Sequence, residues 1–173
     1  AQKIPLITYL LRSRTEQSVL IFCSKKQSVK QLSRELKRAK FNIEEIHSDL
    51  TQSAREQVML DFRSRRLKIL VATDIISRGI DIDNIDLVIN YDVPNDGEDY
   101  IHRIGRTARA ETDGTAYTFI SEKEQNKFAI IENLLGSPVK KATIPESFGP
   151  VPPYEPRKGG RGKGRYKPHF RKK

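Results

Sequence analysis

Apolar positions along the chain fall into two patterns, short continuous runs and longer stretches at helical spacing. The continuous runs are rich in β-branched residues, which is typical of buried parallel strands. The spaced stretches carry one apolar face, as an amphipathic helix does. The predicted strands are Ser18–Cys23, Phe41–Ile46, Leu67–Ala72, Asp86–Asn90 and Thr115–Ile120, and the predicted helices cover 1–17, Lys26–Lys40, Ser53–Arg65, Gly97–Ile104 and Glu122–Leu135.

Helix boundary signals agree with this division of the chain. Asp96 precedes one predicted helix as an N-cap, and Gly136 and Pro138 follow the last one. Strand alternates with helix five times, which predicts an α/β domain whose parallel sheet of five or six strands has helices on both faces. Ligands bind such sheets at the carboxyl ends of the strands. The segments expected there are Ser24–Lys26, His47–Asp49, Thr73–Asp83 and Tyr91–Asp92.

One segment, His102–Arg109, concentrates positive charge. Its arginines follow one another at steps of three, so a helix would place them on one broad face. Such a face is either solvated or bound to an anion, and phosphate matches the planar fork of guanidinium. The apolar neighbours Tyr100, Ile101 and Ile104 favour an ordered segment and therefore a phosphate ligand.

The loop Ala72–Asp83 is the second stretch with candidate chemistry. Thr73 can offer a hydroxyl and a backbone N–H to a phosphate, and Arg78 supplies charge. Gly79 permits close backbone approach. Asp81 can only accept hydrogen bonds, which suits a ribose hydroxyl. The alternative is a connecting loop with an Arg–Asp surface pair, and spacing alone leaves both open. The phosphate reading gains weight because the arginines of His102–Arg109 are predicted to lie at the same edge of the sheet.

Composition narrows the class of protein. The 173 residues are 36% hydrophobic and 31% charged, enough for one domain with a core. No apolar run approaches a membrane span, and the N-terminus has no signal-peptide pattern. The one cysteine, Cys23, rules out an internal disulfide framework and favours a reducing, cytoplasmic compartment. Three scattered histidines give no metal-site spacing, so we expect no metal site.

The positive charge is concentrated at the C-terminus. Residues 150–173 hold nine Lys and Arg against one acid, a net +8 of the chain's +10. We therefore expect a globular domain over 1–149 and a disordered Gly/Arg/Lys-rich tail over 150–173. Such a tail either solubilises the protein or tethers RNA weakly and without sequence preference. The second reading is favoured by aromatic residues on which bases could stack: Tyr154, Tyr166, His169 and Phe170.

Four short motifs, in matching order and spacing, make residues 18–122 resemble the C-terminal RecA-like domain of a DEAD-box RNA helicase of superfamily 2. Val19–Ser24 resembles motif IV of that family, and Gln52–Arg55 matches its Gln-x-x-Arg motif. Ala72–Asp81 matches motif V and His102–Arg109 matches motif VI.

The resemblance implies a role for each matched residue. As arginine fingers, two arginines would reach the γ-phosphate of ATP bound on another domain. Contacts to RNA would go to its sugar-phosphate backbone, which predicts low sequence specificity. The implied assignments are ATP phosphate for Arg106 and Arg109, ATP ribose for Asp81, RNA for Arg55, Thr73, Arg78 and Gly79, and coupling between the ATP and RNA sides for His102 and Arg103.

The sequence also departs from that family. Ala108 stands where glycine is usual, and Ser48 stands within the usual His-Gly-Asp. There is no Gly-x-x-x-x-Gly-Lys-Ser/Thr loop and no Asp-Glu-Ala-Asp sequence. ATP and Mg²⁺ would therefore be held mainly by an N-terminal RecA-like domain outside this chain. We expect the chain, either cut from a longer protein or naturally separate, not to hydrolyse ATP alone.

Three functions remain as hypotheses. The first is the second half of a monomeric ATP-dependent RNA helicase that unwinds short duplexes, with RNA and the N-terminal domain as partners and no membrane. The alternative is a non-enzymatic RNA-binding or annealing module driven by the basic tail. The third, a DNA translocase domain of the same superfamily, is disfavoured because the His102–Arg109 motif resembles the RNA group more closely. The sequence does not identify the RNA.

Overall fold

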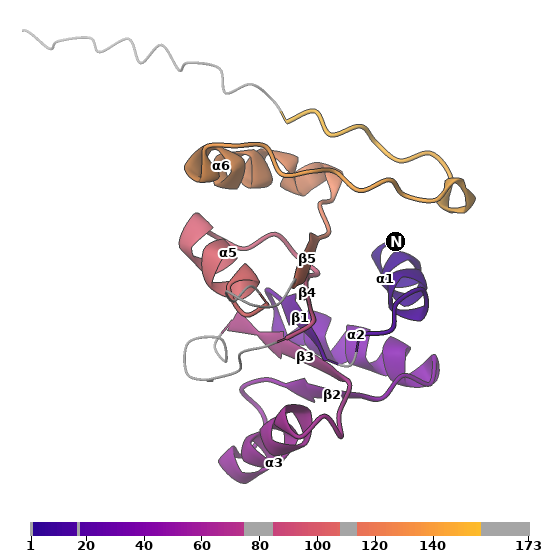
Figure 1. Ribbon diagram of the computed structural model, residues 1–173, viewed down its shortest axis with the longest axis vertical. Helices are drawn as coiled ribbons and strands as arrows, with labels where there is room; N and C mark the ends of the chain where they lie inside the picture. The colour runs from indigo at the N-terminus through magenta and orange to yellow at the C-terminus, as the bar shows by residue number, and fades with distance from the viewer. Residues whose placement is uncertain (1, 17, 75–84, 108–113, 157–173) are drawn as a thin grey trace, which may run out of the picture.

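Five parallel strands form the centre of the computed structural model, which describes residues 2–16, 18–74, 85–107 and 114–156 (Figure 1). The spatial order is β2-β3-β1-β4-β5, so the first strand lies in the middle. This confirms the predicted α/β architecture. The strands are β1 (Val19–Cys23), β2 (Ile43–Ile46), β3 (Ile69–Thr73), β4 (Leu87–Asn90) and β5 (Thr115–Thr118).

Helices cover both faces of the sheet, as predicted (Figure 1). Side chains alternate along β1, so Ile21 and Cys23 pack on one face while Leu20 and Phe22 pack on the other. All of β1 is buried, which explains why its sequence is a continuous apolar run. The helices are α1 (Lys3–Arg12) and α2 (Lys26–Arg38) on the first face, α3 (Gln52–Arg63) on the second, and α5 (Gly97–Ile104) and α6 (Gln125–Leu135) beyond β4 and β5.

Helix ends follow local hydrogen-bonding chemistry. The Asp96 side chain accepts from the Asp99 N–H at 2.8 Å, so the predicted N-cap of α5 is confirmed. Gly136 ends α6 with a φ of 72°, a left-handed conformation that glycine adopts without strain. The helix predicted over Glu122–Leu135 is divided. A 3₁₀ turn, η1 (Glu122–Glu124), precedes α6 because the Ser121 and Glu124 side chains cap each other's backbone N–H groups.

The C-terminal segment packs against α6 further than the sequence indicated. Tyr154 donates its hydroxyl to Glu132 at 2.6 Å, and Gln125 donates to the carbonyl of Pro153 at 2.7 Å. Residues 153–155, which we expected to belong to the disordered tail, therefore make specific contacts with α6. The aromatic ring of Tyr154, which we expected to stack on bases, instead lies 6.3 Å from that of Phe128. Residues 157–173 lie outside the described part.

Candidate functional site

The carboxyl ends of the central strands meet, as the sequence predicted. Cys23 at the end of β1 is in register with Thr73 at the end of β3, and Phe22 is in register with Asn90 of β4. The next residue after β1, Ser24, donates its backbone N–H to the Asp92 carboxylate at 3.0 Å. The residues that end or follow β1, β3 and β4 therefore place polar groups together at the carboxyl end of the buried sheet.

Thr73 has a buried hydroxyl at this edge. The residue is 7% exposed, and its Oγ1 has no hydrogen-bond partner within the described ranges. A buried hydroxyl without a partner is unfavourable by about 1–3 kcal/mol. A ligand oxygen at the strand end would satisfy it, which fits the phosphate contact suggested by the sequence.

Arg55 lies in the first turn of α3, beside the loop that follows β2. Its Nη2 donates to the Ser48 carbonyl at 3.0 Å, and its buried Nε has no partner in the described part of the chain. Thr51 starts the helix by accepting from the Ala54 N–H at 3.2 Å. The Thr51 cap thus fixes the first turn of α3, from which Arg55 reaches the loop after β2. The Nε of Arg55 remains available as a donor to a ligand.

Asp49 in the same loop forms ion pairs with two lysines of α2. Its carboxylate oxygens accept from Lys26 at 2.7 Å and from Lys30 at 2.8 Å. These two hydrogen bonds lower the pKa of Asp49 to about 2. Both lysines therefore have a partner in Asp49, and Arg55 is the cation beside this loop with an unused donor.

Arg103 is buried, contrary to the expectation of a solvent- or phosphate-facing arginine cluster. Its side chain is 1% exposed and makes two 2.6 Å bonds to the Asp74 carboxylate. It also donates to Asn90 Oδ1 at 3.1 Å and lies over the Phe22 ring at 5.1 Å. A protein carboxylate therefore occupies the bidentate position on Arg103 that a phosphate would take if the whole arginine cluster bound one. Its guanidinium does reach the carboxyl edge, where we had placed it.

Arg106 is not on the helix with Arg103, because α5 ends at Ile104. Its carbonyl accepts from the Ile85 N–H at 3.3 Å, just before β4 begins. The prediction that the arginines gather at the carboxyl edge is thus wrong for the main chain of Arg106. The chain must return toward the amino ends of the strands here, because β5 runs parallel to β4.

The two residues that flank segment 75–84 are both held by residues 103–107. Asp74, before the loop, is bonded to Arg103. Ile85, after the loop, donates to the carbonyl of Arg106, and its own carbonyl accepts from the Thr107 hydroxyl at 2.5 Å. Residues 103–107 therefore hold both residues that flank segment 75–84, in which Arg78, Gly79 and Asp81 occur.

The remaining predicted site residues fall into two groups. His102 is described and is exposed on α5. Four site residues, together with the family departure at Ala108, lie outside the described residues: Arg78, Gly79, Asp81 and Arg109.

Sequence reasoning missed the partners of the buried arginine. Asp74 directly follows a strand end, and Asn90 is a polar residue that ends an apolar strand. A polar side chain in a buried run needs a partner, which is the signal that could have identified Asn90. Thr107 and Asp92 gave no comparable signal. Their hydrogen bonds depend on how the folded chain brings distant segments together, which the sequence does not show directly.

Cys23 and Tyr91 at this edge are not poised for proton transfer. Burial, followed by the nearby Asp92 carboxylate, raises the pKa of the Cys23 thiol far above its ordinary value. Burial likewise raises the pKa of Tyr91 to about 12. Both groups are therefore neutral at physiological pH, consistent with the expected inert role of Cys23. Within the described ranges no cluster of His, Cys, Asp and Glu could hold a metal, and no helix there is long and apolar enough to cross a bilayer.

Comparison with known proteins gives a consistent result. The family described as helicase conserved C-terminal domain matches residues 2–111. ATP-dependent RNA helicase FAL1 of Kluyveromyces lactis is 43% identical over 131 residues, which are 76% of this chain and 33% of that protein. This chain thus spans about a third of that relative's length.

Solved structures give the same match. A DEAD box protein from Methanococcus jannaschii superimposes with a TM-score of 0.76 at 38% identity, over 82% of this chain and 39% of that one. Dbp5 of S. cerevisiae, bound to RNA and ADP BeF3, superimposes with a TM-score of 0.74 at 33% identity, over 79% of this chain and 37% of that one.

Proposed function

This chain belongs to the helicase conserved C-terminal domain family, in the DEAD-box group of ATP-dependent RNA helicases, and we propose that it works as the second half of a motor that unwinds short RNA duplexes. The observation that carries the proposal is that residues 103–107, which lead to the proposed arginine fingers, hold both Asp74 and Ile85. These two residues flank segment 75–84, which is proposed to contact RNA and ribose.

The proposed partner for ATP hydrolysis is an N-terminal RecA-like domain, which would hold ATP and Mg²⁺. Bound Mg²⁺ would neutralise charge on the phosphates. Arg106 and Arg109 would then approach the γ-phosphate and stabilise the negative charge that develops during transfer. Asp81 would accept from the ribose hydroxyls. With no phosphate-binding loop in its sequence, the chain alone would not hydrolyse ATP.

RNA is the proposed substrate, held through its backbone. The buried hydroxyl of Thr73 and the unused Nε of Arg55 support contacts to phosphate or sugar oxygens. Arg78 and Gly79 would extend the same contact from segment 75–84. Dbp5, which has the same fold, is seen with RNA and a nucleotide analogue together. Backbone contacts of this kind would give little sequence preference.

Coupling between the ATP and RNA sides is proposed to pass through Arg103 and His102. Arg103 supports this role because it contacts the residue before the RNA loop while lying on the helix that leads to Arg106. His102, exposed beside it, would contact the second domain. We also propose that the protein works as a monomer in the cytoplasm, where its single buried thiol would stay reduced.

The test is ATPase and RNA binding by the full chain with an N-terminal RecA-like domain supplied in trans. We expect ATP-dependent RNA affinity, and we expect Arg106→Ala to lower turnover by about 10³-fold or more. Arg12→Ala, at an exposed position on α1, is the matched control and should leave turnover unchanged. Turnover by the chain alone, abolished by Arg106→Ala, would contradict the requirement for a second domain.

A second outcome would favour the annealing module. If RNA affinity is indifferent to ATP and is lost when residues 150–173 are removed, the basic tail is the binding element. The motor proposal would then fail, because the strand-end groups would not be contributing to RNA binding.

A further inference from the structure

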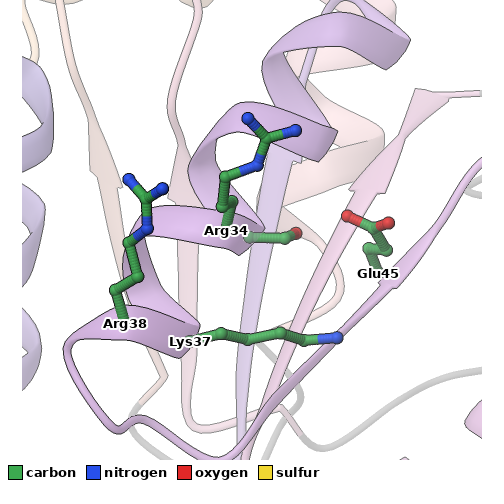
Figure 2. A pocket seen from close by; sticks show the side chains of 5 residues that line it. Arg34, Lys37, Arg38 and Glu45 are labelled. Carbon is green, nitrogen blue, oxygen red and sulfur yellow. The ribbon is translucent and has the colours of Figure 1, made fainter.

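A pocket of about 440 Å³ opens between α2 and the edge strand β2, and none of the residues assigned above lines it. Figure 2 shows Arg34 and Arg38 extending their guanidinium groups in the same direction from the helix, while Glu45 faces them from the strand. Lys37 and Ser33 complete the lining. One wall is therefore positive and the other negative, so a suitable ligand combines an anion with hydrogen-bond donors.

Two polar groups of the pocket have no partner within the described residues. Lys37 and Arg38 each pair with a glutamate, at 2.9 and 2.8 Å, but Arg34 makes no hydrogen bond or ion pair there. Ser33 is 1% exposed, and its hydroxyl is also without a partner. A buried hydroxyl and an uncompensated guanidinium on adjacent residues are together suited to one ligand carboxylate.

The negative wall is also an open strand edge. β2 pairs only with β3 in the part of the sheet that the structure describes. Ile69 of β3 donates to the Asn42 carbonyl at 3.0 Å, and parallel pairing makes alternate residues face the neighbouring strand. Ile43 and Glu45 therefore turn their backbone N–H and C=O groups away from β3. Glu45 thus presents both its backbone and its carboxylate to the pocket.

We propose that this groove binds an extended segment of a partner protein that carries one acidic side chain and adds to β2 as a further strand. The added strand would exchange backbone hydrogen bonds with Glu45, as peptides do at open sheet edges. Its acidic side chain would reach Arg34 and the Ser33 hydroxyl. The remaining side chains of the added strand would point alternately toward the two faces of the sheet, because successive residues of a strand point to opposite sides.

Local charge favours a peptide over RNA. An RNA strand gains affinity by neutralising several phosphates with cations that have no other partner. Along this groove the bases and acids nearly cancel, so only one uncompensated cation is available to a ligand. The bases are Lys26, Lys30, Arg34, Lys37 and Arg38, and the acids are Glu35, Glu44, Glu45 and Asp49.

The experiment compares two libraries of end-blocked heptapeptides on the immobilised full chain. Flanking positions are drawn from Thr, Val, Ile and Ser, and the central residue is Glu in one library and Gln in the other. We expect the Glu library to be retained about tenfold better, because one charge-assisted hydrogen bond separates them. Arg34→Gln should remove that preference, whereas Arg12→Gln, an exposed control on α1, should keep it.

Hydrogen exchange locates the contact. Retained Glu peptides should slow exchange of the Glu45 amide if they pair with β2. Equal retention of the two libraries, or a preference that survives Arg34→Gln, would overturn the proposal. So would oligouridine RNA that binds through Arg34 more tightly than the retained peptides, since the groove would then be a nucleic-acid site.

Discussion

Asp74→Asn tests how the buried Arg103 is held. The substitution keeps the shape of the side chain but removes the charge that answers a guanidinium with 1% exposure. Breaking a buried ion pair from one side costs about 3–5 kcal/mol. Asp74 is itself 25% exposed, and Arg103 keeps acceptors on Asn90 and Asp92, so the lower end applies. We expect a loss of about 3 kcal/mol in the free energy of unfolding, or about 6–12 °C in Tm.

The assay is urea and thermal unfolding of the full chain at pH 7, followed by circular dichroism. Arg38→Gln removes an exposed ion pair with Glu35 and should change stability by less than about 0.5 kcal/mol. The double variant Asp74→Asn/Arg103→Met should be more stable than the sum of the single effects predicts, because it leaves no buried charge. If Asp74→Asn behaves like Arg38→Gln, the pair does not hold Asp74 in place and the argument from the bonds of residues 103–107 fails.

Three further outcomes follow from particular contacts. Thr73→Val should weaken RNA binding in the two-domain assay about fivefold while raising the Tm, because it removes a buried hydroxyl that has no partner among the described groups; Thr73→Ser is the control. Burial raises the pKa of Glu124, but hydrogen bonds from Ser121 and Lys3 outweigh it and hold that pKa below its ordinary value. Stability from this carboxylate is therefore present above about pH 4.5 and lost as pH falls through the lower folded-state pKa, so Glu124→Gln should flatten the stability–pH curve in acid. Gly114→Ala should cost about 1–3 kcal/mol by urea unfolding, since its methyl would come within 2.0 Å of a carbonyl oxygen.

Most of the fold could be predicted because its determinants are local. The wholly apolar run of β1 reflects burial on both faces, and Asp96 marks the start of α5 by its own hydrogen bond. Strand and helix alternate along the chain, so the parallel topology follows with little freedom. These features need only neighbouring residues, which a sequence shows directly.

The sequence does not show in the same way which arginines are buried and which are available to a ligand. Whether a guanidinium faces a ligand or the interior depends on partners far away in sequence, and Asp74 is 29 residues from Arg103. A motif that places arginines three residues apart treats them alike, but the end of α5 at Ile104 separates Arg103 from Arg106. The packing of Tyr154 on Glu132 was missed for the same reason. Its partner is distant in sequence, and composition alone placed Tyr154 in a disordered tail.

The bonds that hold Asp74 and Ile85 give a physical basis for communication between the two proposed ligands. These two residues flank segment 75–84, and both are bonded to the short segment 103–107. Because Arg103 is buried and makes its bonds at fixed geometry, a displacement of segment 103–107 by a γ-phosphate at Arg106 would move both flanking residues together. Coupling therefore needs no long pathway across the domain. It needs only that segment 103–107 and the two flanking residues move as one body, which their shared hydrogen bonds favour.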